Sequence, residues 1–187
     1  MYTWQQQETV SVKGKVKKQD LYEVEVSRDG RTERTPIRLP DDSSSGTMQP
    51  AWRDWMIQKK AKELEEYAQQ VRELAQNYIP PDLERLQEGL RQGELKVQPG
   101  GDPSEVRLVM HDYLKPGDNM TLVFNRASGQ LHGIKVLSYL KNRGDQVTAS
   151  AQFAELPDGT NYLSNMVANG LRKSVTIAIE NLDHRKM

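Results

Sequence analysis

The chain contains no cysteine among its 187 residues. Disulfides, thiolate metal sites and thiol nucleophiles are therefore excluded. The absence fits an exported bacterial protein, for which we expect a periplasmic or otherwise extracytoplasmic location. Many cytosolic proteins also lack cysteine, so a cytoplasmic location stays open.

An excess of one charge is also lacking, because 26 lysines and arginines match 26 aspartates and glutamates. Nucleic-acid binders usually carry a basic excess, since phosphate neutralisation dominates their affinity. We therefore expect no nucleic-acid partner. No apolar run approaches the ~20 residues that a transmembrane helix requires, so we expect a chain that does not span a membrane. The first residues, MYTW, form neither a basic nor an apolar leader, and we expect any native export signal to lie outside this chain.

Alternation of apolar and polar residues dominates both ends of the chain and predicts antiparallel strands. Residues 2–17 and 21–26 alternate, and Asp29-Gly30 between the second and third segments is a strong hairpin signal. Residues 31–39 predict a weaker third strand. From Glu94 onward, short alternating segments are separated by turn signals roughly every 10–15 residues, which predicts a meander of sequentially paired strands.

Between these regions the period changes to that of a helix. A polar loop at 41–46 comes first, and Pro80-Pro81 ends the helical pattern. One apolar stripe runs along the helix at steps of four and three residues: Ile57, Ala61, Leu64, Ala68, Val71, Ala75 and Tyr78. We expect this whole stripe to pack on the sheet.

A shorter helix follows, with Pro81 in its first turn and either Gly89 or Gly93 at its end. Its apolar residues share one side: Leu83, Leu86 and Leu90. Because the apolar sides of helices and sheet must cover one another, we expect both helices to lie on the sheet.

The predicted fold class is α+β. We expect a curled antiparallel β-sheet, a half-barrel of about 8–10 strands, with one long and one short helix packed on the concave face. The whole chain, 1–187, should form a single domain with N-terminal strands in 1–40, a helical insertion in 49–92 and an antiparallel meander in 94–182. A two-sheet sandwich with a helical hairpin at one end is the alternative.

A basic stripe lies on one side of the first predicted strand: Lys13, Lys15 and Lys17. If the chain turns near residues 19–20, Lys17 faces Glu23 and Lys15 faces Glu25. Such pairs would neutralise the lysines. We therefore interpret the stripe as a solvated strand face rather than a surface for a membrane or an anionic polymer.

Catalytic and metal-binding patterns do not emerge from the sequence. The three histidines, at positions 111, 132 and 184, are widely spaced, whereas a metal site needs at least three well-placed ligands. No serine sits in a G-x-S-x-G context. We expect a non-enzymatic protein without a metal or a cofactor.

Aromatic residues are the most informative candidates for function. Trp52 and Trp55 are three residues apart and share a helical face. A packed core and an apolar cleft between helix and sheet need the same residue types, so both interpretations stay open. The candidate ligand-lining residues are Trp4, Trp52, Trp55, Met56, Tyr67, Met120, Phe124 and Phe153.

Two stretches of the C-terminal half, GDNMTL at 117–122 and FAELPDGTNY at 153–162, resemble uncharacterised bacterial envelope proteins. The order of elements along the chain resembles the open-barrel periplasmic carriers of the lipoprotein-localisation (Lol) type and their relatives among mycobacterial lipoproteins. This resemblance implies a curled antiparallel sheet, helices that plug its concave face, and an apolar cavity between them. It assigns no role to an individual residue.

The first functional hypothesis is a non-enzymatic extracytoplasmic protein that binds a lipid, an acyl chain or another hydrophobic ligand between helix and sheet. The alternative is a protein–protein interaction or structural module of the bacterial envelope, with envelope proteins as partners and a sheet edge such as residues 31–39 as the contact surface. An enzyme is the third hypothesis, and it would require polar side chains that converge in a deep cleft.

Overall fold

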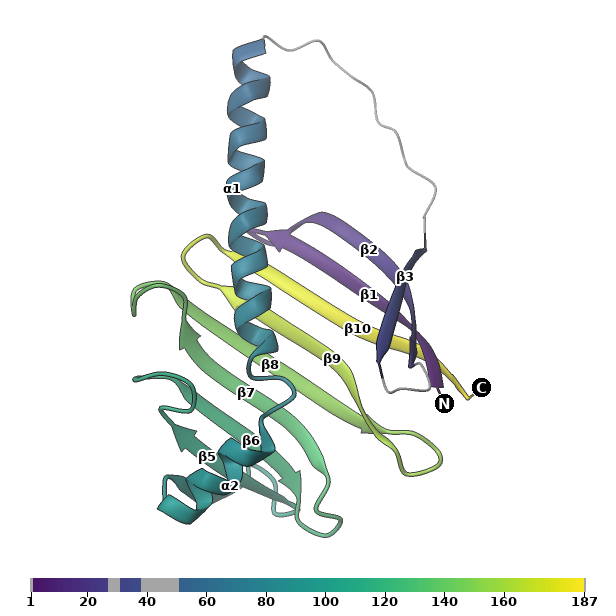
Figure 1. Ribbon diagram of the computed structural model, residues 1–187, viewed down its shortest axis with the longest axis vertical. Coiled ribbons are helices and arrows are strands. Elements are labelled where there is room, and N and C mark those ends of the chain that lie inside the picture. The colour runs from purple at the N-terminus through teal and green to yellow at the C-terminus, as the bar shows by residue number, and fades with distance from the viewer. Residues whose placement is uncertain (1, 27–30, 38–50, 187) are drawn as a thin grey trace.

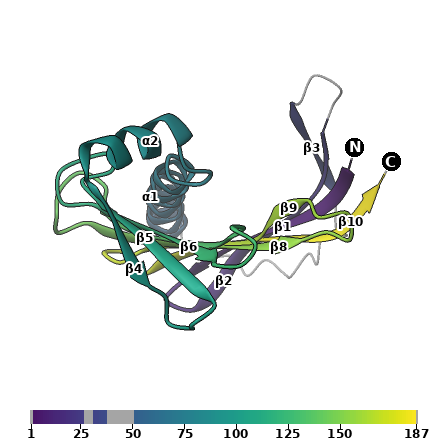
Figure 2. The same ribbon diagram turned by 90° about the horizontal axis from the view of Figure 1, so that it is seen from below.

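Ten strands form one open antiparallel sheet, and two helices lie on its concave face (Figure 1, Figure 2). The computed structural model describes residues 2–26, 31–37 and 51–186, with the backbone alone at 51–56. The strand order is β3-β2-β1-β10-β9-β8-β7-β6-β5-β4. The predicted α+β class with a curled sheet is confirmed, and the two-sheet sandwich is wrong.

The elements follow the order that the sequence predicts. The N-terminal strands are β1 (Tyr2–Val12), β2 (Lys15–Val26) and β3 (Thr32–Ile37). The helices are α1 (Ala51–Gln76) and α2 (Leu83–Gln92). The remaining strands are β4 (Leu95–Pro99), β5 (Glu105–His111), β6 (Asn119–Asn125), β7 (Leu131–Tyr139), β8 (Gln146–Glu155), β9 (Asn161–Gly170) and β10 (Val175–Lys186). The predicted hairpin signal at Asp29-Gly30 and the polar loop at 41–46 lie outside the described residues.

The first hairpin turns earlier than the sequence pattern predicts. Lys13 and Gly14 have φ values of 50° and 74°, which suit a two-residue turn whose twist matches that of the flanking strands. The lysines therefore do not face the glutamates of β2. The observed partners are Gln5 for Glu23, Thr3 for Glu25 and Val12 for Lys15. The predicted neutralisation of the lysine stripe is wrong, because the turn lies at 13–14 and not at 19–20, six residues nearer the N-terminus.

Both edge strands of the sheet contain a proline. Gly100 donates its backbone N–H to the carbonyl of Glu105 on β5, so the ring nitrogen of Pro99 on β4 faces away from the sheet. Pro36 occupies the other edge strand, β3. A proline on an edge strand offers no N–H to an incoming strand. Strand addition at either edge is therefore limited.

The two halves of α1 have different surroundings. The second half lies across β9 and β10, whereas the first half extends beyond the sheet (Figure 1). The predicted stripe is buried at Ala68, Val71, Ala75 and Tyr78, but Ile57 is exposed. The prediction that the whole stripe packs on the sheet is therefore wrong for its first two members, Ile57 and Ala61.

Glycine at position 170 sets the close approach of α1 to the sheet. An added Cβ on Gly170 would lie 2.5 Å from Cε1 of Tyr67 and 2.7 Å from Cγ2 of Val71. Its neighbours on the concave face are also small, since Ala168 pairs with Ala149. The helix therefore packs directly on small residues of β8 and β9, and no cavity separates it from β9 at Gly170.

The caps of α2 fix its position in the chain. Asp82 is the N-cap, and its carboxylate accepts the backbone N–H groups of Glu84 and Arg85. Pro81 therefore precedes the cap, and its predicted place in the first turn is wrong. Gly93, with φ 73°, ends the helix in the left-handed conformation, which confirms one of the two predicted end points.

The predicted apolar side of α2 is not the side that faces the sheet. Gly89 is buried, and a Cβ there would lie 2.5 Å from Cε of Met110 on β5. Leu86 packs partly against the core, but Leu83 and Leu90 are mostly exposed. The glycine allows the closest contact, so the helix is rotated away from its leucine stripe.

Gly170→Ala tests the close contact between α1 and β9. The added methyl group forces Tyr67 and Val71 apart, so we expect the free energy of unfolding to fall by about 1–3 kcal/mol. Urea unfolding followed by circular dichroism measures this change. Gly101→Ala is the matched control, because the close neighbour there is the flexible end of Arg107. Equal stability of the two variants would contradict the packing.

Candidate functional site

Three polar contacts hold α1 against the sheet. The hydroxyl of Tyr67 donates to the buried carboxylate of Asp145 in the β7–β8 turn, at 2.7 Å. Arg72 forms an ion pair with Glu8 of β1, and the Glu8 side chain is nearly fully buried. The third contact joins Tyr78, just after the helix, to Asp118 at 2.5 Å. Each contact reaches a different strand or turn, so together they fix the helix in both directions across the sheet.

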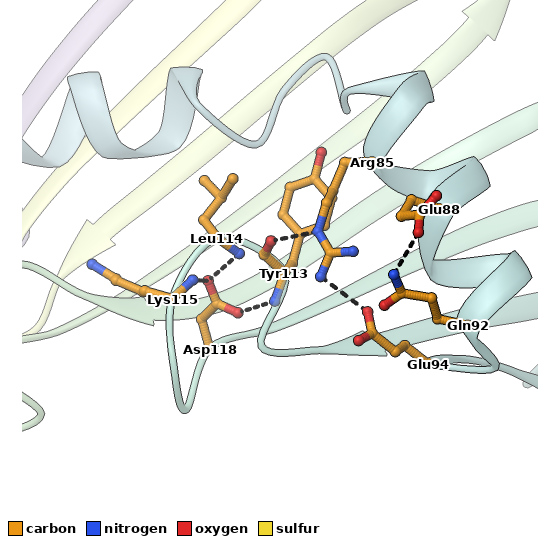
Figure 3. A network of polar contacts seen from close by, with 8 residues as sticks. All are labelled: Arg85, Glu88, Gln92, Glu94, Tyr113, Leu114, Lys115 and Asp118. Carbon is orange, nitrogen blue, oxygen red and sulfur yellow. Dashed lines mark hydrogen bonds and ion pairs between the residues drawn. The ribbon is translucent and has the colours of Figure 1, made fainter.

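Asp118 organises the β5–β6 turn (Figure 3). Its carboxylate accepts the backbone N–H groups of Tyr113, Leu114 and Lys115 at 2.6, 3.0 and 3.1 Å. Gly117 has φ 88°, and Asp118 donates its N–H to the carbonyl of Lys115, as in a type II turn. The carboxylate is therefore a structural hub, with its oxygens used by backbone groups and by Tyr78.

The same turn anchors α2. Arg85 donates from Nε to the carbonyl of Tyr113 and pairs with Glu94 at 3.0 Å (Figure 3). The hydroxyl of Tyr113 in turn accepts the backbone N–H of Asp82, the N-cap. Both helices are thus attached to one turn of the sheet.

The interface between α1 and the sheet is filled by side chains. Two hollows lie between α1 and the turns at 140–145 and 171–174. One, of about 260 Å³, is lined by Gln70, Glu73, Leu74, Asn77, Leu140 and Lys141. The other, of about 150 Å³, is lined by Glu63, Glu66, Tyr67, Gln70, Lys141, Arg172 and Lys173. The second is lined mostly by charged side chains, which does not suit an acyl chain, whereas the first combines Leu74 and Leu140 with polar side chains.

A different part of the concave face carries partly exposed apolar side chains. It lies at the ends of the strands that α1 and α2 leave uncovered (Figure 1, Figure 2). Phe124 pairs with Leu131 across β6 and β7, and Phe153 pairs with Leu163 across β8 and β9. All four are only partly buried and pack against the core. We call these four residues and Trp4 the concave patch.

Buried amides border the concave patch at Trp4. The indole Nε1 of Trp4 and the Nε2 of Gln6 both donate to Oδ1 of Asn181, at 3.2 and 2.8 Å. Asn181 donates from Nδ2 to the carbonyl of Leu163. Within the described part of the chain, Gln6 Oε1 and Thr3 Oγ1 are the buried side-chain atoms without a hydrogen-bond partner. A buried acceptor without a donor is rare and marks a place where a bound group could donate.

The sheet splits beside these amides. Beyond Asn165, β9 pairs only with β8, and beyond Glu180, β10 pairs only with β1. Irregular pairing clusters here, with register shifts in β1 between Thr3 and Gln5 and in β8 between Gln152 and Phe153. Bulges increase the local twist, which accounts for the divergence of the strands.

Side chains rather than backbone groups bridge the split. The ring of His184 stacks on Trp4 at 5.7 Å and lies 4.0 Å from the ring of Tyr162, between ring centroids. Burial lowers the pKa of His184 below its usual value. The carboxylate of Asp158 accepts the hydroxyl of Tyr2 at 2.5 Å. The concave patch is therefore bounded by the split between β9 and β10, which aromatic and polar side-chain contacts bridge.

The eight residues predicted to line a ligand site do not gather in one place. Trp4, Phe124 and Phe153 belong to the concave patch, whereas Tyr67 and Met120 are buried in the core. The side chains of the other three lie outside the described residues: Trp52, Trp55 and Met56.

Several residues in the concave patch and at its border were not predicted from the sequence. Leu131 and Leu163 lie in alternating segments, but alternation does not distinguish covered from uncovered positions on the same face. Gln6 and Asn181 fall on the apolar face of their strands, and a polar residue at such a position is a signal that the alternation could have revealed.

Metal and membrane criteria add little to this site. Among residues 2–26, 31–37 and 57–186, no three or more histidine, aspartate or glutamate side chains gather as metal ligands would. None of the described helices is long and apolar enough to cross a membrane.

Neither a protein-family model nor a curated protein matches the chain. A search of solved structures finds the crystal structure of a LolA superfamily protein from Nitrosomonas europaea. That protein is 11% identical to this chain, with a TM-score of 0.39, and the match covers 100% of this chain and 86% of that chain. At this identity and score, no residue role is transferred from it.

Alkaline pH tests the burial of Tyr78. Burial, reinforced by the hydrogen bond to Asp118, raises the pKa of Tyr78 far above its usual value. Above the usual pKa of tyrosine, the folded state therefore keeps the phenol neutral while the unfolded state ionises it. We expect the free energy of unfolding to lose this contribution as the pH rises above about 10, where unfolded tyrosine ionises. Urea unfolding at a series of pH values measures the loss.

Tyr78→Phe is the comparison for this pH series. The variant should lose about 1.5–3 kcal/mol at neutral pH, because a buried hydrogen bond to a carboxylate is removed. Above pH 10 its stability should fall less steeply than that of the unmodified protein. Identical slopes for the two proteins would show that Tyr78 does not carry the effect.

Proposed function

We propose that this protein is a non-enzymatic extracytoplasmic binding protein that holds an acyl chain or a similar hydrophobic ligand on the concave patch. The single observation that carries the proposal is the row of partly exposed apolar side chains on the uncovered part of the concave face. The proposed site differs from the sequence hypothesis, which put the ligand between α1 and the sheet. Close packing at Gly170 supports the change of place.

The chemistry of the patch suits a ligand with an apolar chain and a polar head. Each CH₂ group that leaves water on binding contributes about 0.8 kcal/mol. Phe124, Leu131, Phe153 and Leu163 are already partly desolvated, so a chain laid across them removes the remaining water from both surfaces. The unpartnered Oε1 of Gln6 would accept a hydrogen bond from a hydroxyl or amide of the head group.

Trp4 serves as a built-in reporter for this site. The chain has three tryptophans, so the variant Trp52→Phe/Trp55→Phe retains Trp4 as the single indole. We expect a dibrominated fatty acid to quench the fluorescence of this variant with a saturable dependence on concentration, because bromine quenches at contact. Quenching that appears only with Trp52 and Trp55 present, and leaves Trp4 unaffected, would overturn the proposed place of the ligand.

Leu163→Gln tests the patch itself. The substitution places an amide where the acyl chain would lie, and we expect binding to weaken about tenfold, in line with the loss of two CH₂ contacts. Leu137→Gln is the matched control, since Leu137 is exposed and faces the convex side of the sheet. Equal binding by both variants, or no lipid in organic extracts of the purified protein together with no uptake of a fatty acid, would refute the proposed function.

A further inference from the structure

Four turns lie side by side at the end of the sheet that α1 crosses. They are the β1–β2 turn at 13–14, the β5–β6 turn at 112–118, the β7–β8 turn at 140–145 and the β9–β10 turn at 171–174. Lys13 donates its backbone N–H to the carbonyl of Ser174, which joins two of them directly. We call this set the turn row.

The turn row is basic, although the chain as a whole has no net charge. It contains six cationic residues: Lys13, Lys115, Lys141, Arg143, Arg172 and Lys173. Lys15 lies directly beside the first turn. Of the three aspartates in the row, Asp118 and Asp145 are buried and hydrogen-bonded inward, and only Asp112 is exposed. Arg172 pairs with Asp145, and Glu63 and Glu66 of α1 line a hollow together with Lys141, Arg172 and Lys173. The turns themselves therefore carry an excess of exposed positive charge, which α1 offsets in part.

The described turns at the opposite end of the sheet carry fewer cations, although β10 ends there with Arg185 and Lys186. The described turns there are 100–104, 126–130 and 156–160, and their ionisable residues are Asp102, Arg126 and Asp158. A zero formal charge thus conceals an uneven distribution along the strand direction. An uneven field of this kind orients a protein toward an anionic surface before contact.

Exposed aliphatic side chains accompany the cations. Leu171 and Leu114 occupy the tips of two turns and are 50% and 47% exposed, and Val16, beside the first turn, is 60% exposed. The first half of α1 extends from the same end and exposes Ile57 together with Lys60 and Lys62. Cations interleaved with exposed aliphatic residues are typical of surfaces that bind at a lipid–water interface.

We propose that the turn row is a docking surface for a membrane that contains anionic phospholipids. The lysines and arginines attract the head groups, and the aliphatic tips, with Leu171 foremost, enter the outer layer of the bilayer. The concave patch faces a different direction and is not needed for this contact. The inference therefore stands apart from the proposed ligand site.

A soluble polyanion is the competing partner, and the turn row favours the membrane. Charge alone would serve a nucleic acid or an acidic protein equally well. Exposed leucines at the turn tips gain nothing from such partners but gain free energy when they leave water for the acyl region. The turn row also presents no exposed aromatic side chain that could stack on nucleic-acid bases, because its tyrosine, Tyr113, is buried.

Sedimentation with phospholipid vesicles tests the proposal. We expect the full chain to bind vesicles of phosphatidylcholine mixed with phosphatidylglycerol, and to bind pure phosphatidylcholine vesicles far more weakly. Binding should weaken as salt is added, because mobile ions screen exposed charges. Equal binding to both types of vesicle, or no binding to either, would overturn the proposal.

Charge reversal in the turn row supplies the decisive comparison. Lys13→Glu/Arg143→Glu should weaken binding to the anionic vesicles about 30-fold or more, given about a fivefold effect for each cation near such a surface. Arg126→Glu/Lys135→Glu changes the net charge equally but lies at the far end of the sheet and on its convex face, and it should bind as the unmodified protein does. Equal losses in both variants would overturn the proposal.

Leu171→Asn separates the membrane from a polyanion. The leucine is at an exposed tip, so the fold should keep its stability, while vesicle binding at high salt should fall several-fold. A single-stranded oligonucleotide serves as the soluble polyanion. If the protein binds it as tightly as the anionic vesicles, and Leu171→Asn affects neither, the turn row is a general anion-binding surface and the membrane proposal is wrong.

Discussion

The close contact between α1 and β9 at Gly170 is the constraint on which the other features depend. It holds the second half of the helix directly on the sheet, where Tyr67 reaches Asp145 and Tyr78 reaches Asp118. A helix this close fills the concave face beneath it. The concave patch is therefore confined to the far ends of the strands, and the first half of the helix extends past the turns.

Periodicity predicted the elements and their order because strands and helices differ in the spacing of their apolar residues. Ala68, Val71 and Ala75 were assigned correctly to a buried helical face. The same stripe continues to Ile57, which is exposed, because periodicity does not state how far the sheet reaches beneath the helix. Periodicity also could not predict that α2 faces the sheet with Gly89. A glycine adds nothing to an apolar stripe, but it permits the closest approach of the helix to Met110.

The early turn at Lys13-Gly14 shows how a local conformation can change a functional interpretation. Two residues with positive φ were enough to shift the register of β2 and remove the expected lysine–glutamate pairs. The candidate site was only partly accessible from the sequence for a related reason. Trp4, Phe124 and Phe153 lie on β1, β6 and β8 at the same end of the concave face, and alternation does not reveal which end the helices leave uncovered. The bulges beside Asn181 also leave little trace in the residue pattern.

The pairing of β1 with β10 joins the two ends of the chain in the middle of the sheet, between Tyr2–Val12 and Val175–Lys186. Contacts between residues this far apart in the sequence form slowly, because the entropy cost of closing a long loop comes before the contacts stabilise the fold. A nascent chain cannot form the ladder between β1 and β10 until β10 has been synthesised. Until that moment, β1 and β9 each expose one unpaired side to other chains.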